Sequence, residues 1–175
     1  MAELETAEQV TAYLAEMSPS VEYHVQPFPS GWLCTRVLSR EEMERDAGLG
    51  LARLVVDSET GIVYVYPSWS ELMVVEAFTE FKQTGVNRAG RRIYPYQRSI
   101  AIHRIREDET TIEYQLTAES LNDPPEPTQH ISMTVEKRTL AYEPRNSFTR
   151  VAISRTEAES RSNQGIWPET ATTQV

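Results

Sequence analysis

Two short segments rich in β-branched and aromatic residues, 52–57 and 62–66, constrain the fold of this chain more than any other feature. Only Ser-Glu-Thr-Gly separates them, and Gly61 at the end of this turn is free to take the positive φ that hairpin loops favour. Two such runs joined by so short a loop predict an antiparallel hairpin. The fold must therefore contain an antiparallel sheet.

Amphipathic helices are predicted on both sides of this hairpin. The first covers 6–17, where Thr6 and Gln9 fit a capping box; the second covers 69–83, with a capping box at Ser68 and Glu71. Gly85 is the expected C-cap of the second helix. Its apolar stripe, which we expect to face a core, comprises Leu72, Val75, Ala77, Phe78 and Phe81. Two further strands are predicted before the hairpin, at 21–26 and 32–38.

Beyond a polar linker at 85–92, the pattern is almost wholly β. Four strands are predicted there, at 96–106, 111–117, 130–143 and 146–154. Residues 156–175 lack periodicity and predict an extended polar tail. The predicted fold class is α+β, with an antiparallel sheet packed against two helices and a four-stranded C-terminal region. The predicted domains are 1–85, 92–155 and the tail at 156–175.

The charge distribution favours a protein partner. The net charge is −9, which argues against binding to duplex nucleic acid or to anionic membranes and favours a basic protein. Residues 82–106 hold seven basic side chains and no acid. Arg98, Arg104 and Arg106 share one strand face, as a single-strand nucleic-acid patch would require. We favour the alternative, in which these arginines pair with the acidic N-terminal region or with Glu113 and Glu119.

The N-terminal sequence and the hydropathy indicate a cytoplasmic protein. Acidic residues stand where a signal peptide would carry Lys or Arg, and no apolar run approaches the roughly 20 residues that span a bilayer.

No pattern of catalytic or metal-binding residues emerges. The histidines, His24, His103 and His130, all fall in predicted strands, where we expect surface or edge positions. A pair between His24 and Cys34 on adjacent strands is the one candidate for nucleophilic chemistry, and it lacks any supporting motif. No zinc, calcium, phosphate-loop or dinucleotide spacing occurs. We therefore expect a non-enzymatic protein without cofactors.

Two features are typical of binding surfaces. An acidic loop carries Glu41, Glu42, Glu44 and Asp46, and Trp69 stands at a helix start. Tryptophan is frequent at the centres of protein interfaces. Trp32, inside an apolar strand, is expected in the core, whereas core and surface positions remain equally open for Trp69. The acids and Trp69 are the predicted partner-binding residues.

The order of elements around the sequence RLVVDSETGIVYVYPSWSELMVVEAF resembles the immunity protein 35 family, also called the YrhB-like domain. The matching features are Gly31-Trp32, the run Leu54-Val55-Val56-Asp57, then Thr60-Gly61, Val63 and the helix at 69–83. The resemblance covers about residues 4–83. It implies a small bacterial protein that neutralises a toxin by direct binding, and it carries over no catalytic residue.

The sequence thus favours a non-catalytic protein-binding module of the immunity-protein kind, with a basic toxin domain as its partner. The alternative is a structural component of a phage or secretion particle, whose tail becomes ordered on neighbouring subunits. An enzyme or small-ligand binder built around His24 and Cys34 is the third hypothesis. The oligomeric state remains open.

Overall fold

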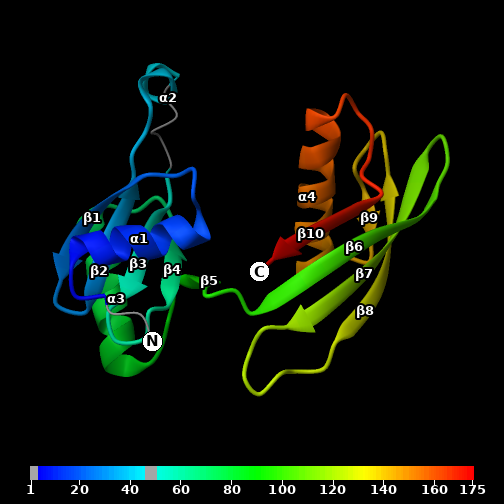
Figure 1. Cartoon of the computed structure of the whole chain (residues 1–175). Helices are drawn as coiled ribbons and strands as arrows, with labels where there is room; N and C mark the ends of the chain where they lie inside the picture. Colours follow the sequence, from blue (N-terminus) through cyan, green and yellow to red (C-terminus); the bar gives the residue numbers. More distant parts are fainter. Residues whose placement is uncertain (1–3, 46–50) are drawn as a thin grey trace. The chain divides into compact units, whose positions relative to one another are not determined.

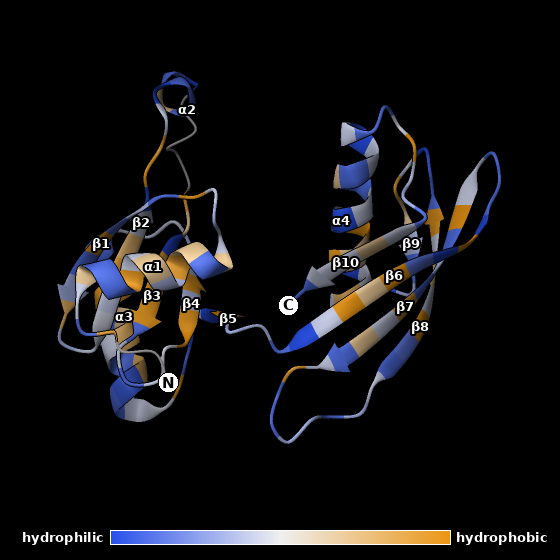
Figure 2. Cartoon of the chain, viewed as in Figure 1, coloured by the Kyte–Doolittle hydropathy of each residue, from blue (hydrophilic) through white to orange (hydrophobic). Residues whose placement is uncertain are grey.

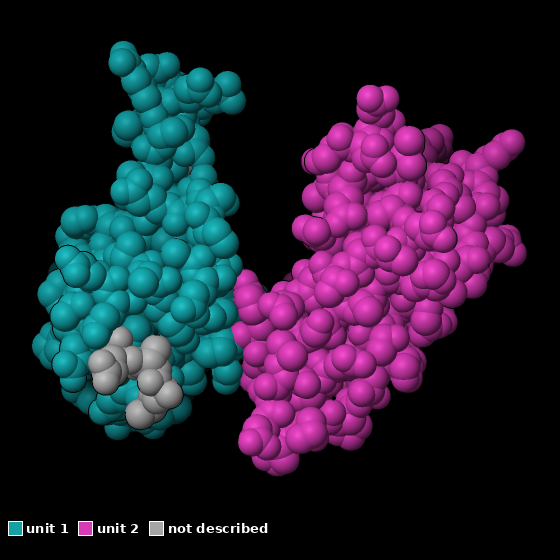
Figure 3. Space-filling view, viewed as in Figure 1, with its two compact units in different colours: residues 1–95 teal, residues 96–175 magenta. Residues whose placement is uncertain are grey.

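The computed structural model describes residues 4–45 and 51–175, which form two compact units. Unit 1 is Met1–Pro95 and unit 2 is Tyr96–Val175 (Figure 3). Each unit has a five-stranded antiparallel sheet and a hydrophobic core made only of its own residues. The predicted α+β class is confirmed.

The sheet of unit 1 is a meander in which each strand pairs with the next along the chain (Figure 1). Its strands are β1 (Tyr23–Phe28), β2 (Gly31–Arg36), β3 (Arg53–Asp57), β4 (Val63–Tyr66) and β5 (Arg91–Tyr94). The predicted hairpin is β3–β4, and Gly61 in its turn has φ 69°. Strand β5 was not predicted: its first residues fall in the expected linker, because Arg91-Arg92 has none of the apolar character that marks a strand.

Helices α1 (Ala7–Met17) and α3 (Glu71–Thr84) cover opposite faces of this sheet. Side chains alternate across a strand, so neighbouring residues serve different helices. Cys34 packs with α1 through Val10 and Leu14, whereas Leu33 packs with α3 through Val74 and Phe78. Figure 2 shows the resulting concentration of apolar residues in the central strands. The predicted packing of one sheet against two helices is confirmed, as is the core position of Trp32.

The helix ends follow local side-chain chemistry. The capping box of Thr6 and Gln9 is present, and Gly85 is the left-handed C-cap of α3. Helix α3 begins two residues later than predicted, because its N-cap is Ser70 rather than Ser68. The hydroxyl of Ser70 accepts a hydrogen bond from the backbone amide of Met73. The buried face of α3 is centred on Val74 and Phe78, and Leu72 lies off this face, 66% exposed rather than part of the core.

Unit 2 places one helix against a sheet of order β10-β6-β7-β8-β9. The strands are β6 (Arg98–Glu107), β7 (Thr111–Ser120), β8 (Gln129–Glu136), β9 (Tyr142–Glu143) and β10 (Thr170–Gln174). The helix, α4 (Ser147–Ser162), packs Ala152 and Ile153 onto the apolar face of the sheet.

The prediction of a strand at 146–154 was wrong. Asn146 and Thr149 form a capping box, and α4 then buries Thr149, Ala152, Ile153, Thr156 and Ser160. This spacing has the helical period, but three of its five members are threonine or serine, so a search for apolar residues alone does not detect it.

The predicted extended tail was also wrong. Residues 156–162 complete α4, Trp167 is buried in the core of unit 2, and β10 pairs antiparallel with β6. The carbonyl oxygen of Trp167 accepts a hydrogen bond from Arg104 at 3.1 Å. The C-terminal region consequently has five strands rather than four, and its last residues belong to the sheet.

Candidate functional site

Trp69 lies between β4 and α3, half-buried against the core that contains Phe78. Its exposed side lines an open pocket of about 310 Å³ in unit 1. The other lining residues are Met73, Glu76, Ala77, Glu80, Val86, Arg88 and Ala89. The sequence left core and surface positions equally open for Trp69, and the residue combines the two. One side of its ring packs on the core, and the other side faces the pocket.

One stripe of α3 forms a wall of this pocket. Met73, Glu76, Ala77 and Glu80 recur at intervals of three and four residues, which places them on one helix face. The opposite wall follows Gly85, whose φ of 73° turns the chain out of the helix before Val86. Sequence reasoning identified Trp69 alone; the spacing of Met73 and Glu76 relative to it was the signal that could have identified the rest.

The pocket rim is acidic. Glu80 pairs with Arg88 at 3.2 Å, and Glu76 makes no ion pair with any described residue. Lys82, the basic residue of the last turn of α3, is engaged elsewhere: its Nζ lies 3.1 Å from Asp57 Oδ2 and 2.5 Å from Glu59 Oε2. These contacts raise the pKa of Lys82, with the Glu59 hydrogen bond as the largest cause.

The predicted acidic residues lie on a different feature, the short helix α2 (Arg40–Glu44), which projects from the sheet in Figure 1. Glu42 pairs with Arg36 at 2.5 Å, and Glu44 pairs with Arg40 at 3.2 Å. The backbone amide of Ser39 holds the pKa of Glu42 below its usual value. Glu41 is exposed, and Asp46 lies outside the described residues. None of the described acids of α2 lines the pocket at Trp69, so the structure does not bring the two predicted surfaces together.

Five basic residues of the stretch 82–106 pair with acids inside their own unit. Besides Lys82 and Arg88, these are Arg98 with Glu126, Arg104 with Glu107, and Arg106 with Asp108. Arg98, Arg104 and Arg106 thus pair within their own unit, but their partners are neither in the N-terminal region nor Glu113 and Glu119, so the expected partners were wrong. The guanidinium of Arg98 also lies 5.8 Å from the ring centroid of Phe148.

His24 and Cys34 do not form a catalytic pair. In the β1–β2 register Cys34 is opposite Val25, while His24 is opposite Thr35 and points to the other face. Cys34 is fully buried, and its Sγ donates to the carbonyl oxygen of Trp32. His103 and His130 lie exposed in β6 and β8.

The Cys34 thiol is expected to be inert in the folded protein. Burial raises its pKa to about 12, so at pH 8 the nucleophilic thiolate is almost absent. We expect its reaction with Ellman's reagent at pH 8 to be at least about a hundredfold slower than in denaturant. Equal rates in folded and unfolded protein would contradict this prediction.

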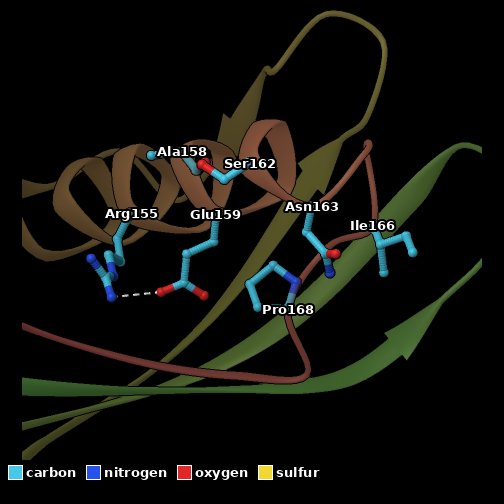
Figure 4. Close-up of a pocket in the computed structure, with 7 residues that line it drawn as sticks. All are labelled: Arg155, Ala158, Glu159, Ser162, Asn163, Ile166 and Pro168. Carbon is cyan, nitrogen blue, oxygen red and sulfur yellow. Dashed lines mark hydrogen bonds and ion pairs between the residues drawn. The ribbon is translucent and has the colours of Figure 1, made fainter.

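A second pocket, of about 360 Å³, lies in unit 2 at the end of α4 (Figure 4). Arg155 and Glu159 form an ion pair at 2.7 Å, and the hydroxyl of Ser162 donates a hydrogen bond to the carbonyl oxygen of Ala158. These polar groups already have partners, so the pocket offers no activated nucleophile.

Across the described residues there is no cluster of His, Cys, Asp or Glu that could hold a metal ion. Within the same residues, no helix is long and apolar enough to cross a membrane.

Taken together, unit 1 is an α+β domain with a helix on each face of its sheet and an apolar, acid-rimmed pocket beside α3. Residues 4–85 of it are an Immunity protein 35-like domain, since the model of the family so described matches these residues. The predicted resemblance is confirmed over this range. Strand β5 and unit 2 lie outside the match. No curated protein matches the chain, and no solved structure does.

Proposed function

We propose that this protein is a non-catalytic immunity protein that neutralises a toxin by binding it through unit 1. The observation that carries the proposal is the Immunity protein 35-like domain over residues 4–85. The architecture of this unit supports it, because two helices bury both sheet faces and leave the surface of the domain, rather than an interior cavity, available for contact.

The charge of unit 1 favours a basic toxin domain. Residues 1–95 carry fourteen acidic and eight basic side chains, a net charge of −6 of the total −9. Opposite charge on the partner accelerates encounter and selects against acidic proteins. The proposed contact residues are Glu41, Glu42, Glu44 and Asp46 around α2, together with Trp69 beside α3. The protein would act in the cytoplasm of the bacterium that makes it.

The test is inhibition of the toxin domain that we expect to be encoded beside the gene for this chain. We expect the purified full-length protein to bind this domain with one-to-one stoichiometry and to abolish its activity. Association should slow as salt is raised, because steering between opposite charges is screened. An unrelated basic protein of equal charge serves as the control. Absence of binding and of inhibition at micromolar concentrations would refute the proposal.

The alternative function, a subunit of a phage or secretion particle, loses its main support. It relied on a polar tail that becomes ordered on neighbouring subunits. Residues 170–174 instead pair with β6 of the same chain, and Val175 hydrogen-bonds to Arg98. The toxin-binding function is therefore the one we retain.

A further inference from the structure

We infer that the pocket between Trp69 and Val86 is where this protein holds its toxin, by receiving an apolar side chain that has a lysine or arginine directly beside it. The inference rests on the proposed function and deepens it by naming the surface and the chemistry of the contact.

The first observation is a concentration of apolar side chains at the surface. Met73 is 48% exposed and Val86 57% exposed, and both line the same pocket as the half-buried Trp69. Single exposed apolar residues are ordinary, whereas a cluster around a concave site marks a contact surface. Tryptophan is frequent among the residues that dominate binding energy, and methionine adapts its shape to an incoming side chain.

The second observation concerns how the pocket is supported. Trp69 and Ala77 pack on the core formed by Val74 and Phe78, which are completely buried. The floor is therefore held in place before any partner arrives, which lowers the ordering cost of binding. A volume of about 310 Å³ is at the lower end of the range for small-molecule sites, which begins at about 300 Å³. This size fits an inserted side chain better than a cofactor.

The third observation is the placement of charge. Glu76 and Glu80 stand one helical turn apart on the pocket face, and like charges at this spacing repel. Arg88 forms an ion pair with Glu80 but not with Glu76, so it offsets the charge of only one of the two acids. The side chains of this pair are largely exposed, Arg88 at 74% and Glu80 at 48%. A cation from the partner, positioned at Glu76, would remove this repulsion. The same carboxylates would repel an acidic segment, which supplies selectivity.

A second copy of this chain is a poorer occupant than a basic toxin. Two copies would bring together units that each carry a net charge of −6. The acids beside the pocket would then face further acids, which is unfavourable. The toxin is accordingly the occupant to which we commit.

The experiment uses calorimetry to measure the affinity of full-length variants for the purified toxin domain that the proposed function expects beside this chain's gene. Met73→Glu should weaken binding at least about thirtyfold, because it places a charge in the apolar pocket. Glu76→Lys should weaken it about tenfold and reduce its salt dependence. The matched control is Leu72→Ser: Leu72 is 66% exposed on the same helix but does not line the pocket, so affinity should stay within about twofold. Circular dichroism must show unchanged folding for all three variants.

The outcomes separate the two claims. If the unaltered protein binds the toxin and Met73→Glu and Glu76→Lys bind equally well, the pocket inference is overturned while the proposed function stands. If the unaltered protein does not bind, both fail. If light scattering shows that the unaltered protein is a dimer and that Met73→Glu converts it to a monomer, the occupant is a second copy and the inference is likewise overturned.

Discussion

Phe78→Ala is expected to lower the free energy of unfolding of unit 1 by about 4 kcal/mol, within the range for deletion of a buried aromatic ring. Phe78 is completely buried, and its ring centroid lies 5.8 Å from those of Phe28 and Tyr64 and 5.9 Å from that of Phe81. Removal of the ring would leave a cavity between α3 and the sheet. Urea unfolding followed by tryptophan fluorescence measures the loss, because Trp69 packs on the same core.

Two controls separate cavity formation from other effects of substitution. Phe78→Leu keeps most of the volume and should cost less than about 1.5 kcal/mol. Leu72→Ala changes an exposed residue on the same helix and should alter stability by less than about 0.5 kcal/mol. A loss below about 1 kcal/mol for Phe78→Ala would show that α3 is not held by this core. Such a result would also remove the support that we assign to the pocket floor.

The sequence predicted unit 1 well because its signals are local. A four-residue turn between two β-rich runs specifies the β3–β4 hairpin, and a threonine followed three residues later by glutamine specifies the start of α1. Neither signal depends on distant residues. The one error in the bounds of α3 arose from a choice between two serines, Ser68 and Ser70, which only the backbone conformation at Ser70 decides.

In unit 2 the prediction failed for two elements, α4 and β10, and the reasons differ. Helix α4 buries threonines that look polar in the sequence, yet Thr156 satisfies its hydroxyl by donating to the carbonyl oxygen of Ala152. Strand β10 consists mostly of threonine, and its pairing with β6 joins residues that are 67 to 75 positions apart in the sequence. Sequence periodicity carries no record of such a pairing.

The candidate site was predictable only in part, for a related reason. Trp69 is conspicuous as a residue type, but its pocket exists because Gly85 turns the chain so that Val86 and Arg88 face α3. The acids of α2 were conspicuous too, although Glu42 and Glu44 turn out to be paired with arginines close in sequence. Charge counting cannot distinguish Glu76, which has no ion pair among the described residues, from acids such as Glu42 and Glu44 that are paired with arginines.

Gly31→Ala is expected to destabilise unit 1 by about 3 kcal/mol, at the upper end of the cost of overpacking. A Cβ at this position would lie 2.3 Å from the carbonyl oxygen of Val56 on the neighbouring strand β3. The contact is with backbone, so no side-chain rotation can relieve it, and β2 would have to separate from β3. Trp32, the next residue, anchors the N-terminal segment by donating from Nε1 to the carbonyl oxygen of Leu4 at 2.9 Å.

The Gly31-Trp32 pair that marks the resemblance therefore has a structural reason: glycine permits the close approach, and tryptophan fixes the segment that leads into α1. Gly85→Ala is the matched control, because a Cβ there meets no atom within 4 Å although its φ is 73°. It should cost only about 1 kcal/mol, from backbone conformation alone. Chemical denaturation of both variants compares a steric cause with a conformational one. If Gly31→Ala proves no more destabilising than Gly85→Ala, close strand approach is not what makes glycine necessary before Trp32.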